Sequence, residues 1–214
     1  MNPEDVWRGI DDQRGRLVDL LEDLSDQEWQ HPSLCEGWSV RQVAAHVALQ
    51  NTRWSAMPRA VLETIRSGGM EGAIHAAASR HAQLPTERIV AEIRERIGVW
   101  RPLPMVTHRG SAIDYLVHLQ DIAIPLGRRQ PMPVDVATVA ADEVWRSPRM
   151  FHARRRFAGQ RFVATDVEWS AGQGPEVTGP ISAILLLLTG RPAGLDHLDG
   201  PGADAVRAAL GVRP

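Results

Sequence analysis

Apolar residues recur every three or four positions along most of the first 130 residues, with acids, arginines and glutamines between them. This spacing is that of amphipathic helices with one buried face. It predicts four helices, over residues 6–24, 39–65, 86–100 and 109–126. Four such helices along the chain suggest a bundle, so a helical bundle is predicted for residues 1–130.

The second predicted helix has the clearest start. Ser39 is a favourable N-cap residue and Gln42 follows three positions later, which is the capping-box pattern. Pro58 bends this helix or ends it early, and Ser67-Gly68-Gly69 stops it. The third predicted helix mixes both charge signs and is expected to be exposed.

The pattern changes after Pro131 and Pro133. A short helix is predicted over 134–145, and residues 161–179 alternate apolar and polar positions around a glycine-rich turn, as strands do. A compact apolar segment, 181–188, and a last helix over 203–210 follow. The predicted fold class is therefore mainly α: a bundle followed by a small α+β domain over 131–214.

Composition and charge exclude several classes of protein. The net charge of −2 and the pI near 6.4 offer no attraction to a phosphate backbone, so no nucleic-acid partner is expected. The longest apolar run, 181–188, is too short to cross a membrane. The N-terminus lacks the pattern of a signal peptide, and Cys35 is the sole cysteine, so a cytoplasmic protein is expected. Every permanently charged basic side chain is an arginine and lysine is absent, a bias associated with GC-rich genomes.

Three polar residues interrupt the fourth predicted helix, which is otherwise apolar nearly all round. Asp114, His118 and Asp121 stand at positions i, i+4 and i+7, on one line down the helix. Such a helix should be buried, and a buried charge without a partner costs several kcal/mol. A divalent metal satisfies a carboxylate and an imidazole together, whereas an Asp114–His118 ion pair is the simpler alternative.

His46 is the candidate for a third metal ligand. It lies on the predicted core face of the second helix, between Val43 and Leu49. Alone it would be interpreted as a core histidine, but two bundle helices that both offer inward ligands favour a metal site. Two histidines and one carboxylate leave coordination positions open, as in catalytic sites. Asp121 is either a residue that orients a ligand or a charge on the helix face.

Other reactive residues give weaker indications. Cys35 lies in a loop just before a helix N-terminus, a setting that can lower the pKa of a thiol, but nothing else around it indicates a nucleophile. The run Arg154-Arg155-Arg156 could face an anion, although a solvated surface is the simpler interpretation. No GxSxG, P-loop or dinucleotide-binding motif is present.

Three segments of the sequence resemble a known family. The sequence over 32–47, PSLCEGWSVRQVAAHV, resembles the signature of the DinB-like, mycothiol-dependent maleylpyruvate isomerase family. Residues 114–127, DYLVHLQDIAIPLG, resemble its second metal-binding helix, and residues 174–202 resemble the C-terminal portion that often follows such bundles. The resemblance therefore extends over most of the chain.

The resemblance implies a DinB-like four-helix bundle with a divalent metal, usually zinc. The family pattern, a histidine on the second helix and a [Glu/Asp]-x-x-x-His pair on the fourth, matches His46, Asp114 and His118. Many members carry glutamate where this chain has the shorter Asp114. The resemblance also implies mycothiol, the small thiol of actinobacteria, as cosubstrate, and a source of that kind agrees with the arginine-only composition.

The resemblance implies an enzyme in which the metal favours the mycothiol thiolate, which attacks a small electrophilic substrate. Addition to a conjugated double bond followed by elimination gives a cis–trans isomerase, whereas displacement of a leaving group gives an S-transferase. The alternatives are a metal-dependent hydrolase and a non-catalytic bundle that binds a ligand or regulates a partner. Arg53 and Arg109 lie near the candidate ligands in sequence and could bind a thiol or substrate carboxylate. The sequence leaves the oligomeric state open, with a homodimer as one option.

Overall fold

The computed structural model describes residues 1–51, 69–101, 106–148 and 151–211. The chain divides into two compact units: residues Pro3–Pro131, and residues Met132–Pro214 together with Met1–Asn2. That residues 1–130 and 131–214 are separate domains remains a prediction. In the first unit the elements are α1 (Pro3–Glu22), α2 (Asp26–Trp29), α3 (Val40–Ala48), η1 (Leu49–Asn51), α5 (Met70–His81), α6 (Thr86–Arg94) and α7 (His108–Ala123).

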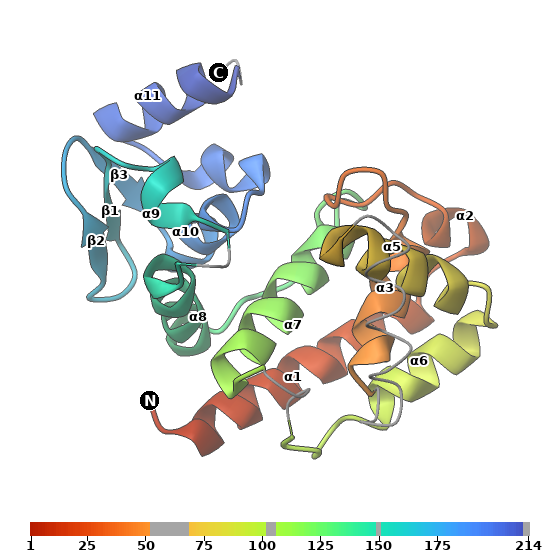
Figure 1. Ribbon diagram of the computed structural model, residues 1–214. Helices are drawn as coiled ribbons and strands as arrows, with labels where there is room; N and C mark the ends of the chain where they lie inside the picture. Colours follow the sequence, from red (N-terminus) through yellow and green to blue (C-terminus); the bar gives the residue numbers. More distant parts are fainter. Residues whose placement is uncertain (52–68, 102–105, 149–150, 212–214) are drawn as a thin grey trace. The chain divides into compact units, whose positions relative to one another are not determined.

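Four helices of this unit close a ring around one core. Helix α1 packs against α6 and α7, and α3 packs against the same two helices, so each long helix touches two others (Figure 1). These are the four helices that the apolar spacing predicts. Helix α7 has buried residues on nearly every face, from Ser111 to Ala123, as expected from its composition. The mainly α, bundle-based fold class is confirmed.

The helix bounds differ from the prediction in three places. Helix α3 ends at Ala48 and continues as the 3-10 turn η1; the remainder of the predicted helix, with Pro58, lies outside the described residues. Helix α6 ends at Arg94, before the predicted end, and it buries Ile89, Val90 and Ile93, so the expectation of an exposed helix is wrong. Helix α5, which packs on α3, was not predicted.

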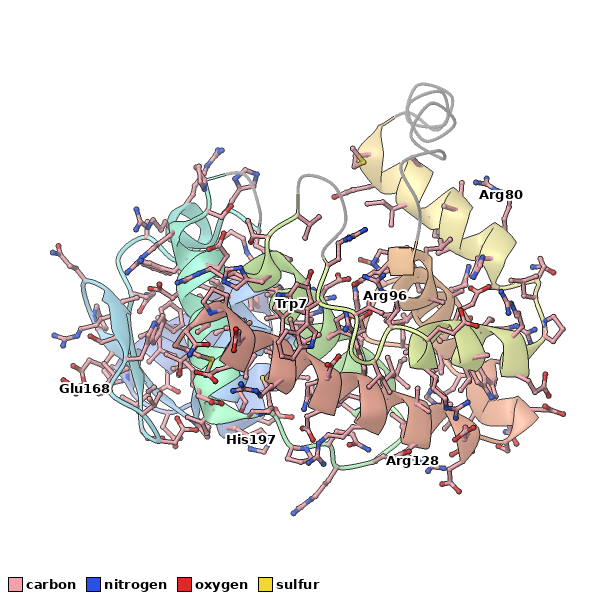
Figure 2. All side chains as sticks on the ribbon, turned by 90° about the horizontal axis from the view of Figure 1, so that it is seen from below. Trp7, Arg80, Arg96, Arg128, Glu168 and His197 are labelled. Atoms are coloured by element: carbon pink, nitrogen blue, oxygen red, sulfur yellow. The ribbon has the colours of Figure 1, made fainter. Side chains whose placement is uncertain are left out.

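A buried arginine on α1 explains why α6 ends early. Arg14 is only 1% exposed and donates hydrogen bonds to the backbone carbonyls of Arg96 (2.7 Å) and Val99 (3.3 Å), just after α6. These bonds satisfy carbonyl groups that a helix end leaves without partners. The Arg14 guanidinium also lies over the ring of Tyr115, 4.6 Å from its centroid. The Trp7 ring lies 5.6 Å from the Arg14 guanidinium, and Trp7 and Arg96 are labelled in Figure 2.

The second unit combines helices with a small sheet. Its elements are α8 (Val134–Arg146), α9 (Ala153–Arg156), β1 (Arg161–Ala164), β2 (Ser170–Gly172), β3 (Glu176–Gly179), α10 (Ile181–Leu188), η3 (Pro192–His197) and α11 (Pro201–Leu210). Strand β1 is central, antiparallel to β2 and parallel to β3. The predicted strands and both predicted helices are confirmed, and the apolar segment 181–188 is a helix.

Helix α10 forms the core of this second unit. All of its residues except Ser182 are buried, and it packs against α8, η3 and β1. Gly194 on η3 lies so close to α10 that a β-carbon there would be 2.4 Å from the Ala183 carbonyl oxygen. A glycine is therefore required for this close packing. No helix among the described residues combines the length and apolar character that a membrane span requires.

Candidate metal centre

Helices α3 and α7 bring the three predicted ligands together. His46 lies in the last turn of α3, whose start is fixed by the Ser39–Gln42 capping box, with both reciprocal hydrogen bonds present. Asp114 and His118 lie one turn apart on α7, on the side that packs against α3. The three side chains are between 15% and 30% exposed, so a small molecule can reach them from solvent.

The Nε2 atoms of both histidines face one carboxylate oxygen of Asp114. Asp114 Oδ1 lies 3.3 Å from His118 Nε2 and 3.7 Å from His46 Nε2. The ligand atoms of the three residues all lie within 4.8 Å of one another. The two imidazole rings meet edge to face, with centroids 4.9 Å apart. An Asp114–His118 ion pair alone does not explain why a second imidazole turns its Nε2 toward the same oxygen.

The separations fit a divalent metal. Two donors bound about 2.0–2.1 Å from a tetrahedral ion lie about 3.3–3.4 Å apart. The His118–Asp114 separation already has this value, and the His46–Asp114 separation is a few tenths of an ångström longer. Two imidazoles and one carboxylate are also ligands that zinc accepts. The residues present are therefore compatible with the metal that the resemblance implies.

The electrostatics of the pair favour the charged forms when no metal is bound. Burial by itself would raise the pKa of Asp114, but the charge of His118 and hydrogen bonds from both histidines hold it well below its usual range. Burial would lower the pKa of His118, but the Asp114 charge and hydrogen bonds to Asp114, Asp121 and Cys35 raise it well above 6.5. A metal ion would therefore have to displace the His118 proton, because only the neutral imidazole is a metal ligand.

Asp121 holds the far side of the His118 ring. Its side chain is fully buried, and Oδ2 accepts a hydrogen bond of 2.8 Å from His118 Nδ1. The sequence allowed Asp121 to be a charge on the helix face, and its burial excludes that interpretation. When Nε2 gives up its proton, this bond keeps the remaining proton on Nδ1 and leaves the Nε2 lone pair directed toward Asp114, which is the arrangement found around metal-bound histidines.

The loop before α3 completes the surroundings of Asp121. Leu34 N–H donates to the Asp121 carbonyl oxygen (3.0 Å), and Cys35 Sγ lies 3.1 Å from Asp121 Oδ2 and 3.9 Å from His118 Nδ1. No local sequence pattern indicates this contact, because the partners are more than 80 residues apart and the loop has no periodicity. Cys35 is thus a neighbour of the metal centre that the sequence analysis did not identify.

Trp38 forms another wall of the centre. Its ring meets the His46 ring edge to face, with centroids 5.8 Å apart, and meets His75 of α5 at 5.3 Å. An aromatic edge against an imidazole restricts the rotation of that ring. Trp38 and the unpredicted helix α5 therefore help to orient His46.

Arg109 and Arg53 are the remaining predicted site residues. Arg109 is half-buried in the first turn of α7, five residues and about 7.5 Å along the helix axis before Asp114. Arg53 lies outside the described residues. Their roles in binding a thiol or a substrate stay predictions.

Comparison with known family models gives one match, over the N-terminal part. Residues 10–104 match the family model described as the mycothiol maleylpyruvate isomerase N-terminal domain. The N-terminal part of this chain is therefore similar to that domain. The match to the mycothiol maleylpyruvate isomerase N-terminal domain includes Cys35, Trp38 and His46 and ends before Asp114 and His118. No curated protein matches the chain.

Two solved structures share the fold over nearly the whole chain. A crystal structure of a histidine-to-alanine mutant of the mycothiol-dependent maleylpyruvate isomerase has a TM-score of 0.65 and 14% identity, covering 95% of this chain and 94% of that one. A crystal structure of the mycothiol-dependent maleylpyruvate isomerase has a TM-score of 0.61 and 15% identity with the same coverage. Both the family domain and the second unit thus have counterparts within one known fold.

Proposed function

We propose that this protein is a metal-dependent enzyme that uses a small thiol, mycothiol, to convert a small electrophilic substrate. The observation that carries the proposal is the convergence of His46, Asp114 and His118 in a bundle that contains a mycothiol maleylpyruvate isomerase N-terminal domain. The solved structures that share the fold are described as mycothiol-dependent maleylpyruvate isomerases, which supports cis–trans isomerisation. S-transfer is the related reaction that the same centre would support.

A divalent metal held by these residues, zinc by preference, would lower the pKa of a bound thiol and polarise a substrate carbonyl. Asp114 contributes one negative charge and the two histidines contribute none, so the protein ligands leave a positive charge for the thiolate and substrate. Asp121 would keep the His118 proton on Nδ1, which leaves the lone pair of Nε2 available to the metal. Trp38 restricts the orientation of His46.

The two proposed reactions differ in the fate of the thiol. In isomerisation, the thiolate sulfur adds to one carbon of a conjugated double bond and the electron pair moves onto the conjugated carbonyl. The remaining single bond rotates, the pair returns, and the C–S bond breaks, so the thiolate is regenerated. In S-transfer, the C–S bond stays and a leaving group departs with the electron pair.

Metal analysis of the purified protein tests the centre. We expect about one zinc or similar ion per chain in the wild type, and its loss in both His46→Ala and His118→Ala. His197→Ala is the matched control, because this histidine is exposed in the second unit (Figure 2) and should leave the metal content unchanged. A wild type that stays free of metal after incubation with zinc would instead support a non-catalytic bundle.

Turnover assays test the chemistry. Maleylpyruvate and mycothiol are incubated with the metal-loaded protein, and both the substrate and the free thiol are followed. Isomerisation gives the trans product with a constant thiol concentration, whereas S-transfer consumes one thiol for each substrate. Conversion that proceeds equally well without any thiol would contradict the proposal and favour a hydrolase.

A further inference from the structure

The thiol of Cys35 lies on the outer side of the metal centre. It is 3.1 Å from Asp121 Oδ2, the same oxygen that accepts the hydrogen bond from His118 Nδ1. The Asp121 side chain is fully buried, whereas Cys35 is half-buried in the loop. Two donors from different segments of the chain therefore meet on one buried carboxylate oxygen.

The loop geometry fixes the position of Cys35. Residues Pro32 and Ser39 form an isolated antiparallel bridge, which closes the loop between them. Inside it, Cys35 N–H donates to Ser33 Oγ (3.2 Å), and Trp38 N–H donates to the Cys35 carbonyl (3.0 Å). Gly37 has a φ of +76°, a conformation that side chains disfavour, so a glycine is needed to close the turn. Cys35 is thus held against α7 by the backbone on both sides.

Cys35, His118 and Asp121 could themselves hold a metal, but the distances argue for hydrogen bonds. Their ligand atoms do gather within 4.8 Å. However, the 2.8 Å between His118 Nδ1 and Asp121 Oδ2 is a hydrogen-bond distance, shorter than the about 3.3 Å between two ligands of one tetrahedral ion. A metal there would also take Nδ1 away from Asp121 and remove the bond that aims Nε2 at Asp114.

We propose that Cys35 is a positioning residue of the metal centre. Its S–H donates to Asp121 Oδ2, holds this carboxylate in the rotamer that reaches His118 Nδ1, and so keeps His118 Nε2 directed toward Asp114 and His46. Cys35 touches neither the metal nor the substrate and acts through Asp121. This inference rests on the metal centre of the proposed function, but it needs neither mycothiol nor the identity of the substrate.

The test measures zinc affinity by competition with a chromophoric chelator in Cys35→Ser and Cys35→Ala. Serine keeps a hydroxyl donor, so the zinc Kd should stay within about threefold of the wild type, whereas alanine should raise it about tenfold, at the low end for outer-shell partners of metal ligands. Cys35→Val, closer to cysteine in size, replaces the alanine variant if circular dichroism shows that alanine unfolds the bundle.

A double-mutant cycle checks that Cys35 acts through Asp121. Asp121→Ala should weaken zinc binding by about 10–100-fold, and Cys35→Ala should add almost nothing in that background. Equal zinc affinities in the wild type and both Cys35 variants, or fully additive losses in the cycle, would overturn the inference and leave the metal centre intact. If the wild type binds no zinc, the inference about Cys35 and the proposed function are both wrong.

Cobalt substitution separates a positioning role from direct ligation. If Cys35 only positions Asp121, the cobalt-loaded wild type and Cys35→Ser have the same absorption spectrum. A sulfur-to-cobalt charge-transfer band that is present in the wild type and lost in Cys35→Ser would show direct ligation and overturn the inference.

Discussion

Asp114 is the residue on which both histidines converge, and its carboxylate carries the negative charge of the three candidate ligands. Asp114→Asn keeps the size of the side chain and removes this charge. Loss of a residue that only hydrogen-bonds to a metal ligand already costs about 10–100-fold in metal affinity. We therefore expect the asparagine variant, which loses the charge of a ligand, to lose at least that much. The zinc Kd, measured by chelator competition, is the readout.

Asp114→Glu is the matched control for this substitution. It keeps the charge and introduces glutamate, the residue that many members of the family named above carry at this position. Zinc affinity should therefore remain within about tenfold of the wild type. Undiminished zinc binding by Asp114→Asn would mean that the carboxylate is not a ligand.

Glu28 gives a residue-scale prediction outside the metal centre. The Arg128 guanidinium (Figure 2) at 2.8 Å, helped by hydrogen bonds from Ser25, lowers the pKa of Glu28 from 4.5 to about 2. Because the folded-state pKa lies below the unfolded value, this carboxylate stabilises the fold above pH about 4.5, and the contribution is lost as the pH falls through about 2. Arg128→Gln should move the pKa of Glu28 back toward 4.5.

Carboxyl NMR shifts of Glu28, followed during an acid titration, measure this change. Arg207→Gln serves as the control, because Arg207 belongs to the second unit and pairs with Asp204. An unchanged pKa of Glu28 in Arg128→Gln would contradict the assignment of Arg128 as the main cause.

The candidate site could be predicted where its residues lie on regular helices. The i, i+4 and i+7 spacing in a nearly apolar helix indicates Asp114, His118 and Asp121, and the predicted core face of the second helix indicates His46. Cys35 could not be found in this way, because its position depends on a loop closed by a bridge between Pro32 and Ser39. Its contact with Asp121 joins segments that no local pattern relates.

At the scale of elements, a capping box marks the start of α3, the helix that carries His46. The Ser39 hydroxyl accepts the Gln42 N–H, and the Gln42 side chain accepts the Ser39 N–H (2.9 Å). Ser39→Ala should lower the free energy of unfolding by about 1 kcal/mol, as loss of an N-cap does. Urea denaturation measures the loss, with Ser39→Thr as the variant that keeps a hydroxyl.

The zinc Kd of Ser39→Ala should stay close to that of the wild type, because Ser39 caps the helix and is not a metal ligand. An alanine variant as stable as the wild type would show that packing alone fixes the start of α3.

The elements that the sequence did not predict lack a strong local signal or depend on distant contacts. Helix α5 is rich in alanine and buries only Ala73 and Ala78, so it shows little apolar periodicity. The early end of α6 depends on Arg14, which approaches from α1, although Gly98, with a φ of +80°, was a local signal for that end. The segment 181–188 is too short and too uniformly apolar for periodicity to distinguish helix from strand.

At the scale of the whole molecule, a bound metal should stabilise the fold by mass action. A ligand that binds only the folded state adds about 2.7 kcal/mol when its free concentration is 100 times its Kd. We therefore expect zinc to raise the melting temperature of the wild type and of His197→Ala, and to leave that of His46→Ala unchanged. Calorimetry with and without zinc measures the shift, and an equal shift in all three proteins would indicate binding elsewhere.

The ring of four helices also determines when the metal centre can form during folding. His46 and Asp114 are separated by about 70 residues, and α6, which lies between them in the chain, is itself part of the ring. The centre therefore requires long-range contacts, and closing the long chain loop between its ligands early in folding costs conformational entropy. If these contacts form after the folding transition state, zinc should lengthen the lifetime of the folded bundle by slowing its unfolding, while the rate of folding stays nearly the same.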